Sequence, residues 1–267
     1  MAQGPHTDLP RQAWPEQAWG QDRVVTEEPL ALRVEGRPLA VTMRTPGHDE
    51  DLAAGFLYTE GVIDGWDDVA ALAKVRDPLD PQDNTLDVRL AAGVDLDDGR
   101  FASAQRAFYA SSSCGLCGKA TIESVLQGAP PLVDPRRASP ELLLSLPQAM
   151  RAAQDTFERT GGLHAAALFD FDGGLEVLRE DVGRHNAVDK VLGWRLRQDR
   201  APVDDRVLLV SGRAGFELVQ KAVMAQVPVL AAVGAPSSLA VELAVESGLQ
   251  LVGFLRDGRF NVYGPRP

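Results

Sequence analysis

The chain has 267 residues, of which 45% are hydrophobic and 24% charged, and a formal net charge of -11. This length suits one large domain or two small ones, and a chain of this size needs no disulfide framework or structural metal for stability. The negative charge argues against nonspecific binding to nucleic acid or anionic membrane, because both repel it. Residues 1–20 contain no apolar run, and no segment offers the roughly 18 apolar residues of a membrane span, so we expect a cytoplasmic protein without a signal peptide.

The N-terminal half predicts a tail, a hairpin and a helix. Residues 1–26 are rich in proline, glutamine and charge, which is typical of a mobile tail. Alternating apolar residues on both sides of positions 35–36 predict a β-hairpin over 30–43. Acidic residues suit the first turn of a helix over 49–61. The further elements are a loop with a short helical piece over 64–84, strands over 86–90 and 107–111, and a helix over 119–126.

The C-terminal half alternates strands and helices. Ser139 and Pro140 predict a helix start, and Pro147 is expected to split the following segment into two helices that end at 161–162. A hairpin is expected over 163–178. The apolar strands then expected lie at 207–210, 229–233 and 249–254, with helices at 216–223 and 239–246 between them. This order predicts an α/β fold whose parallel sheet is covered on both faces.

Cys114 and Cys117 are the two cysteines of the chain, and serines and glycines flank them. Such a segment cannot pack like a core strand, so we expect reachable thiols. The helix predicted after Cys117 and the charge of Lys119 both favour thiolate. Because a thiolate is both a good nucleophile and a good metal ligand, four interpretations arise. They are two buried inert cysteines, a structural zinc, a catalytic zinc, and sulfur or electron transfer on the thiols.

The metal alternatives need more ligands than the two cysteines. A structural zinc would take two of the four histidines, because no second Cys-x-x-Cys occurs. A catalytic zinc of the nucleobase-deaminase type finds support in His48 and Glu50, which have the His-x-Glu spacing of those enzymes. Ser113, however, stands where their motif has proline. Sulfur transfer is an equal competitor, because a second thiol can accept, shield or release the terminal sulfur of a persulfide.

Three glycine-bearing segments, 211–213, 234–238 and 256–259, follow the three predicted parallel strands. Parallel sheets bind ligands at the carboxyl ends of their strands, and helix N-termini after two of these segments add N–H donors. In an acidic protein, Arg213, Arg256 and Arg259 at this edge favour a phosphate-bearing ligand, although ordinary helix capping and surface arginines give the same pattern. His164 and His185 are more typical of structural residues, and Asp181 and Asp189 of residues that cap or solvate a helix. No Walker motif occurs, so nucleotide hydrolysis is not indicated.

Segments 38–56, 113–118, 160–164, 180–190, 211–213, 235–240 and 253–263 occur in the same order as in a known family. Together they resemble the formate dehydrogenase accessory sulfurtransferase family (FdhD/NarQ). The resemblance runs from about Val24 to Tyr263 and leaves the N-terminal tail outside. It implies a cytidine-deaminase-like three-layer α/β/α sandwich without deaminase chemistry. We therefore expect a tail over 1–26, an N-terminal subdomain with the β-hairpin over 27–138 that ends in the cysteine loop and its helix, and a C-terminal α/β cofactor-binding subdomain over 139–267.

The resemblance also implies a function. It implies a sulfur carrier that takes sulfur from a cysteine desulfurase as a cysteine persulfide and delivers it to the molybdenum cofactor before that cofactor enters formate dehydrogenase. The cofactor, as bis-molybdopterin guanine dinucleotide, is then a bound substrate, and no resident metal is expected. By position, Cys114 matches the family's persulfide cysteine and Cys117 its partner. A homodimer follows by analogy with the family.

The expected cofactor site combines the family stretch with the strand ends. Its residues are Phe254, Leu255, Arg256, Asp257, Gly258, Arg259, Arg213, Ser237 and Ser238. Two alternatives remain beside the sulfur carrier. One is a zinc-dependent hydrolase of the deaminase type that uses His48, Glu50, Cys114 and Cys117. The other is a noncatalytic chaperone that holds the cofactor at the same edge without using the thiols.

Overall fold

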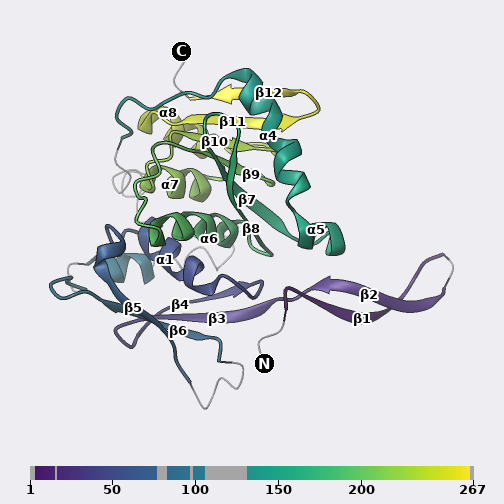
Figure 1. Cartoon of the computed structure of the whole chain (residues 1–267), viewed down its shortest axis with the longest axis horizontal. Helices are drawn as coiled ribbons and strands as arrows, with labels where there is room; N and C mark the ends of the chain where they lie inside the picture. Colours follow the sequence, from purple (N-terminus) through teal and green to yellow (C-terminus); the bar gives the residue numbers. More distant parts are fainter. Residues whose placement is uncertain (1–3, 16, 77–82, 97–98, 106–130, 265–267) are drawn as a thin grey trace.

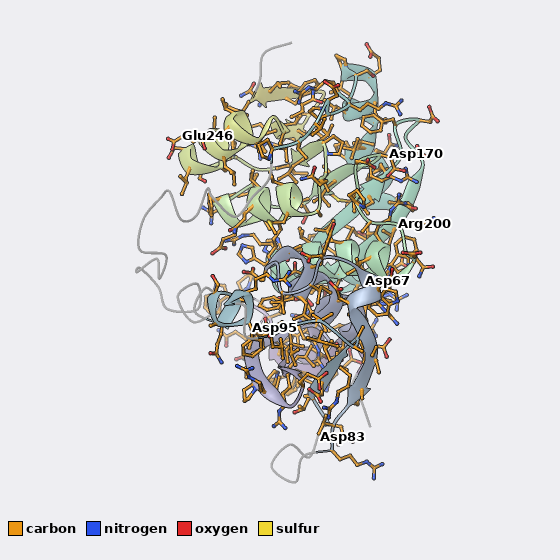
Figure 2. All side chains as sticks on the ribbon, turned by 90° about the vertical axis from the view of Figure 1, so that its left-hand side faces the viewer. Asp67, Asp83, Asp95, Asp170, Arg200 and Glu246 are labelled. Carbon is orange, nitrogen blue, oxygen red and sulfur yellow. The ribbon has the colours of Figure 1, made fainter. Side chains whose placement is uncertain are left out.

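The computed structural model describes residues 4–15, 17–76, 83–96, 99–105 and 131–264 (Figure 1). They form a two-stranded ribbon, a four-stranded sheet, a six-stranded sheet and the helices that cover the sheets. Within these ranges no helix combines the length and the apolar character that a membrane crossing requires. Acidic side chains from different parts of the fold, among them Asp67, Asp170 and Glu246, lie at its periphery (Figure 2).

A β-ribbon stands in place of the predicted mobile tail. β1 (His6–Gln12) and β2 (Trp19–Val25) pair antiparallel along their whole length and project away from the other sheets (Figure 1). Trp14 and Trp19 are 80% and 74% exposed. Backbone hydrogen bonds rather than apolar burial stabilise this ribbon. The amino-acid composition of residues 1–26 therefore does not predict the two strands. The expected subdomain boundaries at 27 and 139 stay predictions.

The four-stranded sheet has the order β4-β3-β6-β5. The predicted hairpin is confirmed as β3 (Glu28–Val34) and β4 (Arg37–Arg44), and the intervening Glu35 and Gly36 have φ of 50° and 74°. Two left-handed residues in succession are typical of the type I′ turn that suits a twisted hairpin. β6 (Thr85–Leu90) is also confirmed, and η1 (Trp66–Asp68) is the short helical piece. β5 (Val69–Lys74) was predicted as loop, because its largely exposed alanine-rich sequence lacks an apolar alternation.

The six-stranded sheet is mixed, with the order β12-β11-β10-β9-β7-β8. Its central strands, β9 (Val207–Val210), β10 (Val229–Ala232) and β11 (Gln250–Arg256), are parallel as predicted. β7 (His164–Phe169) and β8 (Leu175–Asp181) form the predicted antiparallel hairpin, and β7 also pairs antiparallel with β9. β12 (Arg259–Tyr263) pairs antiparallel with β11 and was not predicted, because an edge strand of mainly exposed residues has no apolar pattern.

Helices cover both faces of the six-stranded sheet, as expected (Figure 1). Leu208 and Leu230 face α6 (Arg184–Arg197), α7 (Phe216–Met224) and α8 (Ser238–Ser247). Leu209 and Val229 face α4 (Pro140–Ala152), which leads into α5 (Asp155–Thr160). Alternate residues of one strand thus enter two different cores. The mixed α/β class is confirmed, and the cytidine-deaminase-like arrangement stays a prediction.

The prediction that Pro147 splits its segment is wrong. α4 begins at the expected cap, where the Ser139 hydroxyl accepts a hydrogen bond from the backbone N–H of Leu142 (3.2 Å), and continues through Pro147 to Ala152. Leu143, Leu146 and Met150 bury one face of this helix against the sheet. That burial offsets the backbone hydrogen bond that proline removes.

Two helices join the sheets to each other. α1 (Asp49–Thr59), which the sequence predicts, packs along α6, and both lie between the two sheets (Figure 1). A Cβ atom at Gly55 would lie 1.9 Å from the carbonyl oxygen of Asp189, and one at Gly193 would lie 1.9 Å from that of Asp51. The two backbones therefore touch, and only glycine fits at these two positions.

Candidate functional site

The carboxyl ends of β9, β10 and β11 are tied together at one edge of the sheet. The N–H of Gly234 donates to the carbonyl of Gly212, and the N–H of Phe254 donates to the carbonyl of Gly234, both at 2.9 Å. A Cβ atom at Gly234 would lie 2.9 Å from the Gly212 carbonyl oxygen, so glycine permits this close approach. The three strand ends thus meet where the sequence predicts a ligand.

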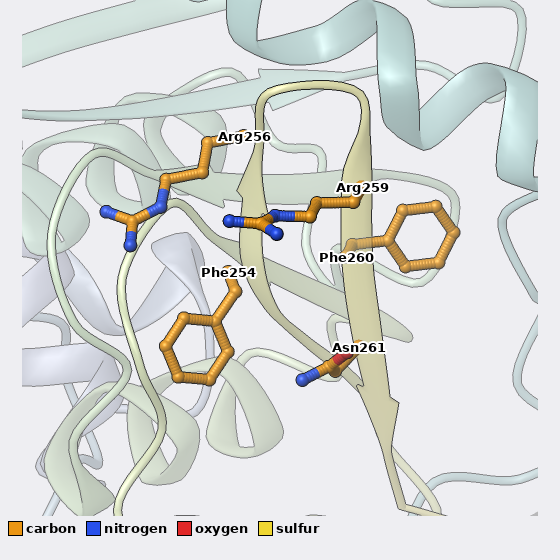
Figure 3. Close-up of a pocket in the computed structure, with 5 residues that line it drawn as sticks. All are labelled: Phe254, Arg256, Arg259, Phe260 and Asn261. Carbon is orange, nitrogen blue, oxygen red and sulfur yellow. The ribbon is translucent and has the colours of Figure 1, made fainter.

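The β11–β12 hairpin presents two arginines side by side. Asp257 and Gly258 form its turn with φ of 55° and 71°, and Arg256 pairs directly with Arg259 across it. Phe254 has a φ of 56° and lies at a shift in the register, and such a bulge re-aims the side chain. Phe254, Arg256 and Arg259 therefore project to the same side of the hairpin, whereas Phe260 projects to the other (Figure 3).

These residues line a pocket of about 230 Å³, together with Asn261. Arg256 and Arg259 are exposed, and within the described part of the chain neither guanidinium has an ion pair or a hydrogen bond. Like charges directly opposite each other in a hairpin are destabilising. An anion between them would remove that repulsion and gain charge-assisted hydrogen bonds, for which the planar guanidinium is suited.

The structure brings together only part of the predicted cofactor site. Phe254, Arg256 and Arg259 line the pocket, whereas Leu255 is fully buried in the core between the sheet and α4. Arg213, Ser237 and Ser238 are exposed, but they line neither this pocket nor its neighbour. The Ser237 hydroxyl accepts a hydrogen bond from the N–H of Ala240 (3.3 Å), so the serine caps α8 itself. One of the N–H donors expected for a ligand at this helix is thus used within the protein.

A second cavity of about 570 Å³ lies beside the first, and Arg256 lines both. Its other walls come from α4, α5, the segment before β7 and the strand ends. The lining residues are Pro147, Met150, Arg151, Gln154, Phe157, Gly161, Gly162, Leu163, His164, Ser211, Val233 and Leu255. Sequence reasoning placed the segment 211–213 at this edge but left Ser211 out of the expected cofactor residues, and it treated His164 as structural. Gln154 was not assigned to a site, because it carries no sequence signal.

The His164 imidazole lies beside the strand ends. A Cβ atom at Gly212 would be 3.3 Å from its Nδ1, so the glycine leaves room for the ring. Burial and the nearby charge of Arg184 lower the pKa of His164 below its ordinary value. At neutral pH the ring is therefore uncharged and offers one hydrogen-bond donor and one acceptor to the cavity.

The two aspartates of the segment 180–190, Asp181 and Asp189, have structural roles. Asp181 was expected to cap or solvate a helix, but it is fully buried. Its carboxylate forms an ion pair with Lys190, with 2.6 Å between Oδ2 and Nζ. It also accepts from the N–H groups of Thr45 (3.1 Å) and Gly183 (2.8 Å), so it links β8 to the segment before α1. Asp189 is likewise buried and pairs with Lys221 at 3.0 Å. Burial raises the pKa of Asp189, and the nearby charge of Lys221 partly offsets this rise.

One residue of the deaminase-type alternative, Glu50, is engaged by another part of the protein. His48 precedes α1, and the Glu50 carboxylate forms an ion pair with Arg197. Cys114 and Cys117, as well as the strand expected over 107–111 and the helix over 119–126, lie outside the described residues.

The model of the FdhD/NarQ family matches residues 25–266. The chain belongs to this family. A "Sulfur carrier protein FdhD" of Streptomyces avermitilis is 56% identical over 248 residues, which cover 91% of this chain and 87% of the relative. One of Mycobacterium tuberculosis with the same name is 51% identical over 250 residues, 91% of this chain and 90% of the relative.

The chain is also similar to a protein whose structure has been solved. A crystal structure of a putative formate dehydrogenase accessory protein from Desulfotalea psychrophila has a TM-score of 0.73 and 25% sequence identity. The similarity covers 97% of this chain and 96% of that one. The fold is therefore shared with that accessory protein over nearly the whole chain.

Proposed function

We propose that the protein is a cytoplasmic sulfur carrier that serves formate dehydrogenase. It takes sulfur from a cysteine desulfurase on Cys114, with Cys117 as its partner thiol, and passes the sulfur to the guanine-dinucleotide form of the molybdenum cofactor as its bound substrate. A homodimer is part of this proposal. The relatives named as sulfur carriers support the sulfur chemistry, and the name of the solved relative supports the link to formate dehydrogenase.

The observation that carries the choice of acceptor is the guanidinium pair of Arg256 and Arg259 beside Phe254, for which the described residues provide no carboxylate partner. A dinucleotide brings phosphates, which suit the two guanidinium groups, and a flat base, which suits an aromatic ring. In a protein of net charge -11, such a pair is a specific site rather than part of a general basic surface. These features favour a nucleotide-bearing substrate over a small neutral one.

The sulfur step needs no oxidant. The thiolate of Cys114 attacks the outer sulfur of the desulfurase persulfide, forms a persulfide on Cys114 and releases the desulfurase cysteine as its thiolate. The outer sulfur carries its oxidation state with it. Attack by the thiolate of Cys117 would release that sulfur as sulfide and leave a Cys114–Cys117 disulfide, so the partner thiol also offers a route for discharge.

A test of the sulfur step is intact-protein mass spectrometry after incubation with a cysteine desulfurase and cysteine. We expect the mass of one added sulfur atom, removable by a reductant and absent in Cys114→Ala. The same variant should abolish maturation of formate dehydrogenase in cells. Full maturation with Cys114→Ala but none with Cys117→Ala would reverse the two roles, and full maturation with both would refute the carrier mechanism.

A test of the nucleotide site is calorimetric titration with guanosine diphosphate. Each charge-assisted hydrogen bond to phosphate is a strong one, so Arg256→Ala and Arg259→Ala should each weaken binding about tenfold to a hundredfold. Arg11→Ala, on the exposed ribbon, is the matched control and should bind as the wild type does. Equal affinity in all four proteins would place the nucleotide elsewhere.

A further inference from the structure

The β1–β2 ribbon projects from the body of the protein as an arm (Figure 1). Among the described residues, its two strands pair only with each other. The body contacts the arm at its base, where the side chain of Val25 packs against Gly162. Farther out, Trp19 is 74% exposed. A two-stranded ribbon is only marginally stable in water, and further strands stabilise it. The arm therefore offers a place for another strand.

The hydrogen bonds of the ribbon determine which backbone groups remain free. At one end the N–H of Ala13 donates to the carbonyl of Ala18 (2.9 Å), and at the other the N–H of Thr26 donates to the carbonyl of Pro5 (3.0 Å). Between these ends the register is unbroken, and bonded and non-bonded pairs alternate along an antiparallel ladder. The pairs 12–19, 10–21 and 8–23 are therefore non-bonded. Their backbone N–H and carbonyl groups point away from the ribbon, to its two outer edges.

The two outer edges differ in their capacity to pair. On β1, one outward position is Pro10, which has no N–H to donate, and proline commonly protects an exposed edge in this way. On β2, the outward residues are Trp19, Gln21 and Arg23. The backbone N–H of Arg23 donates to the Asp22 carboxylate (3.0 Å) and not to β1, which agrees with its outward direction. The edge of β2 can therefore accept a strand, whereas that of β1 is protected.

The edge of β2 is complementary to itself. Two copies of one strand can pair antiparallel about a twofold axis, which is the symmetry of a closed dimer. With the axis at Gln21, each Gln21 faces its counterpart, and Trp19 faces Arg23 of the second copy, where a guanidinium is attracted to the indole ring. An axis at Asp22 or Arg23 would place like charges opposite each other, which is destabilising. An axis at Gly20 would separate Trp19 from Arg23.

The charges of the arm also favour contact with a second copy. Each chain has a net charge of -11, so two bodies repel each other. On the ribbon, however, the charges are paired across the strands, Arg23 with Asp8 at 3.1 Å and Arg11 with Asp22 at 3.8 Å. Contact between two projecting arms joins locally neutral surfaces and keeps the acidic bodies apart.

We propose that the outer edge of β2 binds the same edge of a second copy, with the twofold axis at Gln21, so that two ribbons form one four-stranded sheet. The inference rests on the homodimer of the proposed function and assigns a surface to it. Strands this short bury less than the roughly 1,200 Å² of a stable interface, so the contact is reversible.

A disulfide at the axis tests the contact directly. The Cα atoms of a bonded antiparallel pair lie about 5.5 Å apart, within the range of about 4.4–6.8 Å that a disulfide spans. The full-length variant Gln21→Cys, with Cys114→Ala and Cys117→Ala to remove the native thiols, should therefore form a covalent dimer on mild oxidation. Gln12→Cys in the same background is the matched control. It replaces an exposed glutamine at an outward position of β1 and should stay uncrosslinked.

A charge exchange at the same position tests the register. Gln21→Glu and Gln21→Lys each place like charges at the axis, so self-association measured by sedimentation velocity should weaken about fivefold in each variant. An equimolar mixture of the two should associate at least as well as the wild type, because unlike charges then face each other. The same two substitutions at Gln12 should have no effect, alone or mixed.

A proline substitution tests the backbone pairing. Gln21→Pro removes an N–H that points away from β1, so the ribbon keeps its ladder while both hydrogen bonds of the central pair are lost. Self-association should weaken about tenfold to a hundredfold, and Gln12→Pro should match the wild type.

The outcomes separate this inference from the proposed function. Crosslinking at both positions or at neither, no recovery in the mixed charge variants, or a dimer unchanged by Gln21→Pro would overturn the pairing of the arms. In each of these cases the sulfur carrier still stands. Absence of persulfide on Cys114 in the wild type would instead refute the carrier, and Gln21→Pro should acquire that persulfide as the wild type does.

Discussion

Gly55 and Gly193 set the distance between α1 and α6. Their missing Cβ atoms let each backbone touch the carbonyl oxygen of the other helix, and the contact lies between the two sheets. Helices usually meet through side chains at an axial separation of about 8–10 Å. A contact between backbones leaves no flexible side chain that can yield to an added atom.

Gly193→Ala should therefore destabilise the protein strongly. The new methyl group would lie 1.9 Å from the Asp51 carbonyl oxygen, so the helices must separate and we expect a loss of about 3 kcal/mol or more in the free energy of unfolding. Gly65→Ala is the control, because no atom lies within 4 Å of its added Cβ and a change within about 0.5 kcal/mol is expected. Urea denaturation of both variants measures the difference. Similar stability in the two would show that the helices adjust freely.

The sequence predicts the charged residues of the site better than the polar ones. Arg256 and Arg259 follow a clear apolar strand, so their place at the sheet edge follows from topology. Gln154 lies in the break between two helices, and that break was expected at Pro147. Its burial depends on how α4 and α5 pack on the sheet, which no local pattern encodes. Asp181 was misjudged for the same reason, because its partners, Thr45 and Lys190, come from two other elements.

At the level of elements, local signals explain what could be predicted. The turn at Glu35 and Gly36, the cap at Ser139 and the end of α8 at Gly248 each depend on a few neighbouring residues, and all are present. The elements that were missed, the β1–β2 ribbon, β5 and β12, are exposed strands whose pairing comes from the backbone. α4 continues through Pro147 because the burial of its apolar face against the sheet outweighs the tendency of proline to end a helix.

Across the whole molecule, two histidines make stability depend on pH. Partial burial and the charge of Arg184 lower the pKa of His164 below the ordinary value of 6.5. Partial burial and the charge of Arg179 lower the pKa of His48 in the same direction, although its side chain is 57% exposed. Below about pH 6.5 the unfolded chain therefore binds protons at these positions before the folded protein does. Stability is present in full above that pH and is lost as the pH falls through the lower, folded-state pKa values.

We therefore expect the free energy of unfolding to fall between about pH 7 and pH 5. Urea denaturation at several pH values measures this fall. His164→Gln should reduce the pH dependence, because glutamine does not titrate in this range, and the double variant with His48→Gln should reduce it further. A free energy that is constant over this interval, or a fall that neither substitution alters, would contradict the assignment.

The joining of the two sheets also determines the order in which the protein can fold during synthesis. Thr45 and Thr59 hydrogen-bond partners that lie 136 and 130 residues further along the chain, at Asp181 and Asp189. The apolar face of α1 thus leaves the ribosome long before α6 exists to cover it. Contacts of such long sequence separation form slowly, and an uncovered apolar face favours aggregation in the meantime. The nascent N-terminal half is therefore a natural client for a chaperone until α6 emerges.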